Sequence, residues 1–319
     1  MIINDPVYGK VKINPPAIVE LIKSSPMQRL KKIAQLGLPK KYYFESKYFS
    51  RFEHSVGTML LLKLLNASEK EQIAGLLHDV SHTAFSHVID YLVGSTKKEN
   101  FQDRQHKRFI KSKELSSILK KYGYNPEEIF NYKNFGLLER DLPDACADRI
   151  DYTLRELPKN QRKEIVKHLS TSDGKIIFTN RRVAHQFALL YIDRNVNNWA
   201  SFEAVSRYRI FSGLLRYALN KKYINFKDLW EYDEFVLKKL KKSKDERIYL
   251  VLKILQNKSL KNLPLEERSI HKKFRRIDPL FIENGKVFRL SDVDKKFAKE
   301  LIKIKKFHEK GMRPALIKF

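Results

Sequence analysis

The chain has 319 residues and carries 64 Lys and Arg against 37 Asp and Glu, a formal net charge of +27. Its 42% hydrophobic content is enough for a packed core and excludes a wholly disordered chain. The single cysteine, Cys146, excludes a secreted disulfide scaffold and favours a reducing compartment. Short apolar stretches and the lack of a signal-peptide pattern predict a cytoplasmic protein with no membrane contact. The charge points to an anionic partner, either nucleic acid, a nucleotide or a polyphosphate.

Helical periodicity dominates the sequence and predicts a mainly α protein. In chain order, helices are predicted over Ile18–Leu36, His54–Leu65, the apolar stripe after the capping box Ser68-x-x-Glu71, 104–121, 145–157, 182–220, 226–241 and 295–306. Strands are predicted over Gly9–Ile13, Gly174–Thr179, and the hairpin Leu280–Glu283 with Lys286–Leu290 around Asn284-Gly285. We find no internal repeat and no linker. We expect a helical core over 1–220 and a smaller basic α+β portion over 221–319, packed on that core.

The positive charge is concentrated in the last third of the chain. Residues 221–319 hold 28 basic and 14 acidic residues, a net +14, with basic runs at 238–242 and 272–276. Two interpretations stay open: solvated helix faces in a lysine-rich sequence, or a contact surface for a polyanion such as nucleic acid. No zinc knuckle, glycine-rich phosphate loop or RNA-binding aromatic motif accompanies the runs, so the nucleic-acid signal is electrostatic alone.

Five of the nine histidines lie between residues 54 and 106, and three of them fall in the segment HDVSHTAFSH. If this segment is helical, His78 and His82 are one turn apart and share a face, with Asp79 beside His78. Imidazole and carboxylate groups together suit a divalent transition metal. An antiparallel helical hairpin would bring His54, which lies 24 residues upstream, next to the same group.

A fourth ligand is available from the later segment CADRIDYTLRE, which offers Asp148 or Asp151. Other catalytic arrangements fit less well. The sequence has no G-x-S-x-G elbow, no P-loop and no H-E-x-x-H motif, and Cys146 has no histidine nearby in sequence.

The ordered motifs RFEHS, LLHDVSHTAFSH and ADRIDY resemble the HD superfamily of metal-dependent phosphohydrolases. The resemblance is closest to the deoxynucleoside triphosphate triphosphohydrolase branch, because DPVYG, MQRLKKIAQLGL, DRIDYTLRE and DPLF…RLSDV keep that branch's order. It implies an HD-domain helical core and one divalent metal ion, whether Mn, Mg, Fe, Ni or Zn. It also implies hydrolysis of a dNTP, with dGTP a candidate for the preferred one, to a deoxynucleoside and inorganic triphosphate. A homo-oligomer is a further expectation from the resemblance.

The resemblance assigns roles to individual residues. The metal ligands are His54, His78, Asp79 and Asp148. The catalytic group is His82, His87, Asp90 and His106, with His87 as the general acid, Asp90 and His106 supporting it, and His82 beside the attacked phosphorus. The substrate contacts are Gln35 and Leu36 at the deoxyribose and base, Arg51, Arg149 and Arg194 at the phosphates, Tyr152 against the sugar, and Phe202.

Phe202 departs from the pattern, because relatives usually place a tyrosine there that stacks on the substrate. The nucleotide preference is therefore open, and two alternative functions stay open with it. One is another HD phosphohydrolase chemistry, acting on nucleoside monophosphates, signalling nucleotides or nucleic acid. The other is a basic nucleic-acid-binding or regulatory protein in which the HD site is secondary.

Overall fold

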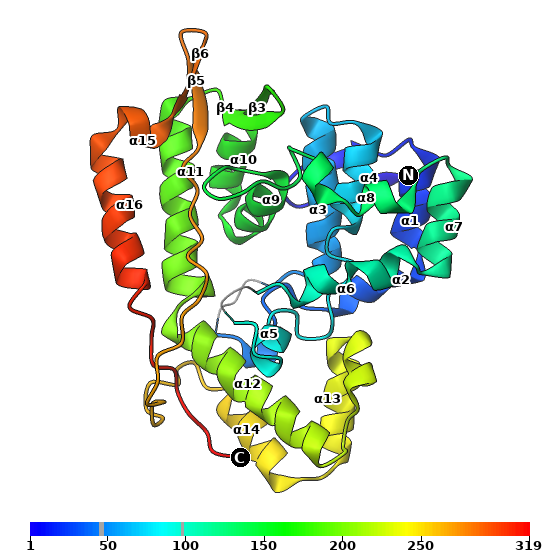
Figure 1. Cartoon of the computed structure of the whole chain (residues 1–319), viewed down its shortest axis with the longest axis vertical. Helices are drawn as coiled ribbons and strands as arrows, with labels where there is room; N and C mark the ends of the chain where they lie inside the picture. The colour runs from blue at the N-terminus through cyan, green and yellow to red at the C-terminus, as the bar shows by residue number, and fades with distance from the viewer. Residues whose placement is uncertain (45–47, 97–98) are drawn as a thin grey trace.

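The structure is a computed structural model that describes residues 1–44, 48–96 and 99–319, and helices make up most of it (Figure 1). The mainly α fold class is therefore confirmed. The α-helices are α1 (Pro16–Lys23), α2 (Ser25–Arg29), α3 (Arg51–Leu64), α4 (Glu69–Leu77), α5 (Val88–Leu92), α6 (Phe101–Ile110), α7 (Lys113–Lys121), α8 (Pro126–Ile129), α9 (Ala147–Glu156), α10 (Lys159–Lys167), α11 (Arg181–Arg194), α12 (Phe202–Asn220), α13 (Asp233–Lys242), α14 (Glu246–Ile254), α15 (Leu290–Val293) and α16 (Lys295–His308).

Several long predicted helices are broken. The predicted helix Ile18–Leu36 ends at Lys23 and restarts as the short α2, because the ring of Pro26 cannot follow a continuous helical turn. The predicted helix 182–220 is interrupted by a π-helical turn at Asn195–Trp199, which separates α11 from α12. Buried asparagines in that turn reach other polar groups, and Ser201 caps the start of α12.

The strands form two small sheets. β1 (Ile2–Asp5) and β2 (Gly9–Lys12) make an antiparallel hairpin at the N-terminus. A four-stranded sheet has the order β3–β4–β5–β6, with β3 at Leu169–Ser172, β4 at Lys175–Phe178, β5 at Leu280–Glu283 and β6 at Lys286–Arg289. β4 and β5 pair in parallel, so the predicted C-terminal hairpin extends a sheet begun far earlier in the chain. The division at residue 220 stays a prediction.

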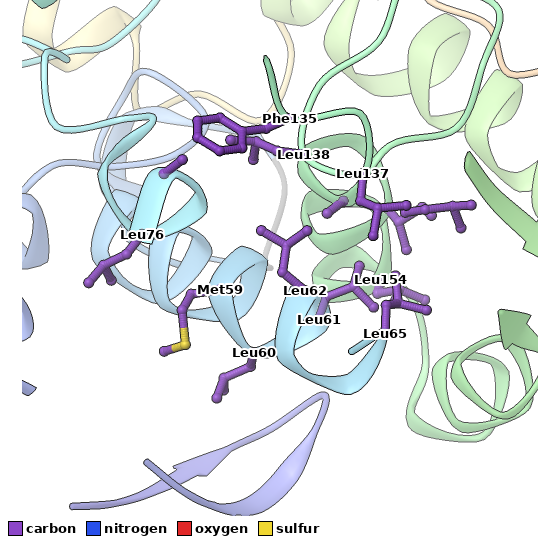
Figure 2. Close-up of a cluster of buried hydrophobic side chains, with 14 of the residues drawn as sticks. Met59, Leu60, Leu61, Leu62, Leu65, Leu76, Phe135, Leu137, Leu138 and Leu154 are labelled. Atoms are coloured by element: carbon purple, nitrogen blue, oxygen red, sulfur yellow. The ribbon is translucent and has the colours of Figure 1, made fainter. Parts of the chain in front are cut away.

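Apolar side chains form two cores. The first core contains α3, α4 and α9, and Figure 2 shows part of it, with several leucines beside Met59 and Phe135. The second core is built around α12, α13 and α14, with Phe85 and Ile89 packed into it. Within the described ranges, none of the helices combines the length and the apolar run that a bilayer crossing needs.

Candidate active site

Three helix ends bring the predicted metal ligands together. His54 lies in the first turn of α3, whose start is fixed by a capping box between Ser50 and Glu53. His78 directly follows the last residue of α4, and Asp148 lies in the first turn of α9. Because α3 packs against both α4 and α9, these three residues meet at one point.

The ring nitrogens and carboxylates of this group converge. His54 Nε2 lies 3.2 Å from His78 Nε2 and 2.9 Å from Asp148 Oδ1. Asp79 lies at the edge of the group, 3.6 Å from His78 Nε2 and 3.8 Å from His54 Nε2. All four predicted ligands are therefore close together. Of the two later carboxylates, Asp148 faces the centre, whereas Asp151 lies behind His54.

Hydrogen bonds behind the two imidazoles fix their tautomers. His54 Nδ1 lies 2.8 Å from a carboxylate oxygen of Asp151, and His78 Nδ1 lies 2.7 Å from the carbonyl oxygen of Gly75. Both partners can only accept, so each Nδ1 donates its hydrogen and each neutral ring presents the Nε2 lone pair to the centre. Two lone pairs and a carboxylate at these distances repel one another unless a cation lies among them. The donor set therefore fits a divalent metal ion.

The charges around this centre favour cations. Burial lowers the pKa of His78, but the neighbouring carboxylates of Asp79 and Asp148 outweigh it and raise the pKa to about 9. Burial alone would raise the pKa of Asp79, but the charges of Arg51 and His78 hold it well below its usual range. Protons and metal ions therefore compete for the same imidazole nitrogens.

A buried network stands behind His54. Asp151 accepts a hydrogen bond from Arg155 Nε at 2.8 Å and another from the Tyr8 hydroxyl at 2.9 Å. Arg155 also pairs with Asp5 at 2.8 Å. Asp5 and Tyr8 belong to the N-terminal hairpin, so this hairpin helps to orient the His54 ring.

Gly57 makes room for this network on α3. A methyl group at Gly57 would overlap the guanidinium of Arg155 and the carboxylate of Asp151. Glycine is therefore required at this position by the close approach of α9, one turn after His54.

Arg51 connects the metal-ligand group to the neighbouring loops. Its Nη1 donates to Asp79 at 2.6 Å, its Nε to the Ser86 hydroxyl at 3.1 Å, and its Nη2 to the carbonyl oxygen of Gln35 at 3.1 Å. The side chain is buried, so its charge acts in a medium of low polarity. This is a suitable position for a cation that contacts a phosphoryl group.

The segment 78–87 is not a helix, and the predicted helical spacing of its histidines is wrong. α4 ends at Leu77, and the chain then crosses from the first core, which contains Val80, to the second core, which contains Phe85. Phe85 and Ser86 both have positive φ angles, 62° and 44°. Non-glycine residues in this region store strain that is common at functional sites.

The turn nevertheless gathers most of the predicted catalytic group. His82 Nε2 lies 3.3 Å from Asp79 Oδ1, and the His87 ring meets the His82 ring edge-on at 5.2 Å. His87 Nδ1 lies 3.0 Å from Asp90 Oδ2, and the His87 side chain is 23% exposed. Burial lowers the pKa of His106 to about 4, which keeps this ring neutral at pH 7.

The predicted base-contacting residues lie in a loop beside Arg51. The Leu36 carbonyl accepts a hydrogen bond from the Tyr208 hydroxyl at 2.7 Å, and the positive φ of Gly37 lets the loop turn against that ring. Among the described residues, the buried Gln35 Oε1 has no hydrogen-bond partner. A buried acceptor without a partner in the protein is completed by a water, an ion or a ligand.

Two predicted phosphate contacts form ion pairs with carboxylates of the chain. Arg149 Nη2 lies 2.5 Å from Glu139 Oε1, and Arg194 Nη2 lies 3.0 Å from Asp193 Oδ2. Phe202 packs against the second core. The substrate contacts of Arg149, Arg194 and Phe202 stay predictions.

Tyr152 lies closer to the centre. Its ring centroid is 5.9 Å from that of His54, and its hydroxyl is 2.5 Å from the hydroxyl of Tyr191. This agrees with a position at the wall of a substrate site. The roles of these predicted contacts stay predictions.

Sequence reasoning missed several residues of the site. The motif DPVYG and the i, i+4 spacing of Asp151 and Arg155 could have indicated the network behind His54. Tyr208, whose hydroxyl donates to the Leu36 carbonyl, carried no signal in the sequence, because only the fold brings it here.

Four similarities to known proteins bear on this arrangement. A family model described as the HD domain matches residues 51–156. The chain is 34% identical over 313 residues to the uncharacterised protein YdhJ of Bacillus subtilis, and the match covers 94% of each. It is 28% identical over 246 residues to metal-dependent phosphohydrolase cns2 of Cordyceps militaris, covering 73% of this chain and 71% of that protein. It is 32% identical over 189 residues to deoxynucleoside triphosphate triphosphohydrolase SAMHD1 of Mus musculus, covering 52% of this chain and 28% of that protein.

Proposed function

Because this chain belongs to the HD-domain superfamily of metal-dependent phosphohydrolases, we propose that it hydrolyses a dNTP to a deoxynucleoside and inorganic triphosphate. The observation that carries the proposal is the convergence of two imidazole nitrogens and two carboxylates beside one buried arginine. The similarity to SAMHD1, whose name states this reaction, supports the choice of substrate.

The chain's own groups have defined parts in this reaction. His54, His78, Asp79 and Asp148 would hold a divalent ion, and that ion would supply the positive charge that polarises phosphoryl oxygens and activates water. Arg51, fixed against Asp79 at 2.6 Å, adds positive charge beside the attacked phosphoryl group. His87 gives a proton to the departing sugar oxygen, and Asp90, 3.0 Å away, orients its ring. His82 lies between the two groups as a neutral donor, because burial lowers its pKa well below the usual value.

The test is a product screen on metal-loaded protein. Each dNTP and NTP is incubated with Mn, Mg, Fe, Ni or Zn, and phosphate products are separated by ion exchange. We expect inorganic triphosphate from dNTPs, and a preference for one base would identify the substrate. If only pyrophosphate or single phosphate appears, the proposed reaction is wrong.

Variants test the site itself. His78→Ala and Asp79→Ala should lose metal binding and turnover, because each variant removes one of the four proposed metal ligands. The exposed His271→Ala serves as the matched control and should retain both. Wild-type activity in His78→Ala would contradict the metal-site assignment.

A second candidate is hydrolysis of a nucleoside monophosphate. It is favoured by the ion pairs of Arg149 with Glu139 and Arg194 with Asp193, which engage two of the cations predicted to hold a triphosphate. The same screen, extended to nucleoside monophosphates, separates the two candidates.

A further inference from the structure

Two members of the basic run 272–276 turn inward. The side chains of Lys272 and Arg275 are only 6% and 21% exposed, whereas Lys273 between them is exposed. Both inward side chains pair with Glu99, whose side chain is 1% exposed. Lys272 Nζ lies 3.3 Å from Glu99 Oε1, and Arg275 Nη2 lies 2.5 Å from Glu99 Oε2.

This Glu99 cluster, consisting of Lys272, Arg275 and Glu99, borders the predicted substrate site. Lys272 Nζ lies 5.0 Å from the ring centroid of Tyr208, whose hydroxyl donates to the Leu36 carbonyl. The Tyr208 side chain therefore lies between the Glu99 cluster and the loop beside Arg51.

The two cations keep Glu99 ionised. Burial opposes ionisation of Glu99, but Arg275 and Lys272, with a smaller contribution from His87, hold its pKa well below the usual range.

The Glu99 cluster has an excess of positive charge. Lys272 Nζ also donates to the Trp199 carbonyl at 2.8 Å, and neither Glu99 oxygen accepts a hydrogen bond of good geometry from the described residues. In the described part of the chain, Glu99 provides the only carboxylate within 4.0 Å of either cation, so two cations face one anion. The buried Tyr91 hydroxyl, whose raised pKa reflects burial and then Glu99, has no hydrogen-bond partner among the described residues. Asn195 Nδ2 also lacks one there, although Asn195 Oδ1 accepts from the Arg275 backbone N–H at 3.4 Å. Buried positive charge and unpaired donors are stabilised by an anionic ligand.

We propose that Lys272 and Arg275 form a polyphosphate-binding subsite of this active site, in which the Glu99 carboxylate stands in for one phosphate group. The inference rests on the proposed function, because it supplies phosphate-binding cations for the same substrate. It assigns to these two residues the contact that sequence motifs predict for Arg149 and Arg194. A substrate with several phosphates binds more tightly because of the subsite, whereas a single phosphate held at the metal does not reach the subsite.

Calorimetric titration of the metal-loaded full chain with inorganic triphosphate tests the subsite directly. Lys272→Met and Arg275→Met should each weaken binding by about tenfold or more, because each removes a charge-assisted contact. Lys273→Met loses the same charge from the same run at an exposed position, and should bind as the wild type does. Glu99→Gln should bind triphosphate several-fold more tightly, since it removes the competing anion. Inorganic phosphate should bind all of these proteins alike.

A double variant distinguishes loss of triphosphate binding from misfolding. Glu99→Gln combined with Lys272→Met removes one charge of each sign, so no carboxylate is left with a missing partner. It should keep the wild-type melting temperature more closely than Lys272→Met does, and should still bind triphosphate more weakly than Glu99→Gln alone. Wild-type affinity in the folded Lys272→Met, Arg275→Met or double variant would overturn the subsite. Unchanged affinity in Glu99→Gln would overturn the role of Glu99.

The subsite and the proposed reaction can fail separately. Lys272-dependent triphosphate binding without triphosphate release from any dNTP would leave the subsite standing and reject the reaction. Triphosphate release with an unchanged KM in Lys272→Met and Arg275→Met would leave the reaction standing and reject the subsite.

Discussion

The orientation of His54 depends on a carboxylate that does not face the metal centre. Asp151→Asn keeps the size of the side chain but cannot accept from both His54 Nδ1 and Arg155 Nε with the same strength. We expect metal affinity to fall about 10- to 100-fold, as is typical when the partner of a metal-binding histidine is removed. Metal titration followed by calorimetry measures the change.

Two further variants sharpen this result. Tyr8→Phe removes a single hydrogen bond to Asp151 and should lower metal affinity less. Asp173→Asn, in an exposed turn, should leave metal affinity unchanged. Wild-type affinity in Asp151→Asn would show that the ring is held by packing alone.

At the level of residues, sequence motifs predict the ligand group well, because the chemistry restricts which residue types can serve. They predict the arginines less well. A guanidinium pairs with whichever carboxylate the fold places nearby, and Glu139, ten residues before Arg149, is brought beside it by a loop without a periodic pattern. Burial and pairing are properties of the fold, so the sequence alone does not predict which carboxylate an arginine or lysine such as Arg149 or Lys272 will contact.

Among the structural elements, the contact between α3 and α9 is the most sensitive to side-chain size. Gly57→Ala places a methyl group against the buried pair of Asp151 and Arg155, which cannot move away without losing its partners. We expect a loss of about 3 to 5 kcal/mol in the free energy of unfolding, measured by urea denaturation, together with weaker metal binding.

Gly75→Ala is the matched control on α4. The methyl group there meets the end of the flexible Leu62 side chain, which can change rotamer, so the loss should be clearly smaller. Equal losses in the two variants would contradict the importance of the buried ion pair.

Sequence periodicity predicts long apolar helices and misses short or polar elements. α10 buries only Ile165, and β1 and β3 have four residues each. Neither a polar helix nor so short a strand gives a clear hydrophobic periodicity in the sequence. The predicted helix 104–121 is likewise two helices, α6 and α7. Local propensity cannot indicate these breaks where tertiary contacts decide them.

For the whole molecule, a single carboxylate of the C-terminal part joins two loops of the site. Asp233, the first residue of α13, accepts from the backbone N–H groups of Ala34 at 2.9 Å and Phe85 at 2.8 Å. Burial raises its pKa to about 7, although these two hydrogen bonds oppose the rise.

This raised pKa predicts a pH-dependent stability. Between about pH 4 and 7 the folded state retains the Asp233 proton that the unfolded state has lost, so the free energy of unfolding falls as the pH rises through this window. The fall due to Asp233 should be about 2 to 4 kcal/mol, and it should be complete above pH 7. The difference in stability between wild type and Asp233→Asn, measured by denaturation from pH 4 to 8, isolates this contribution.

The control for this measurement is the exposed Asp141→Asn, whose difference from the wild type should not vary over the same range. A constant difference for Asp233→Asn as well would mean that its carboxyl group titrates normally.

In the whole molecule, net charge indicates an anionic partner but not where it binds, because two buried cations can matter more than many exposed ones. Nucleic-acid binding by 221–319 and a homo-oligomer stay predictions.

The hydrogen bond from Tyr8 to Asp151 spans 143 residues of sequence, and the pair of Arg155 with Asp5 spans 150. During synthesis, the N-terminal hairpin leaves the ribosome long before α9 exists. It can contact Asp151 and Arg155 only after nearly half of the chain has been made. Until α9 docks, His54 lacks the acceptor that fixes its tautomer, and Asp148 is missing from the centre. If these residues hold a metal ion as proposed, the ion binds only after α9 has docked, and metal binding is therefore a late step in folding.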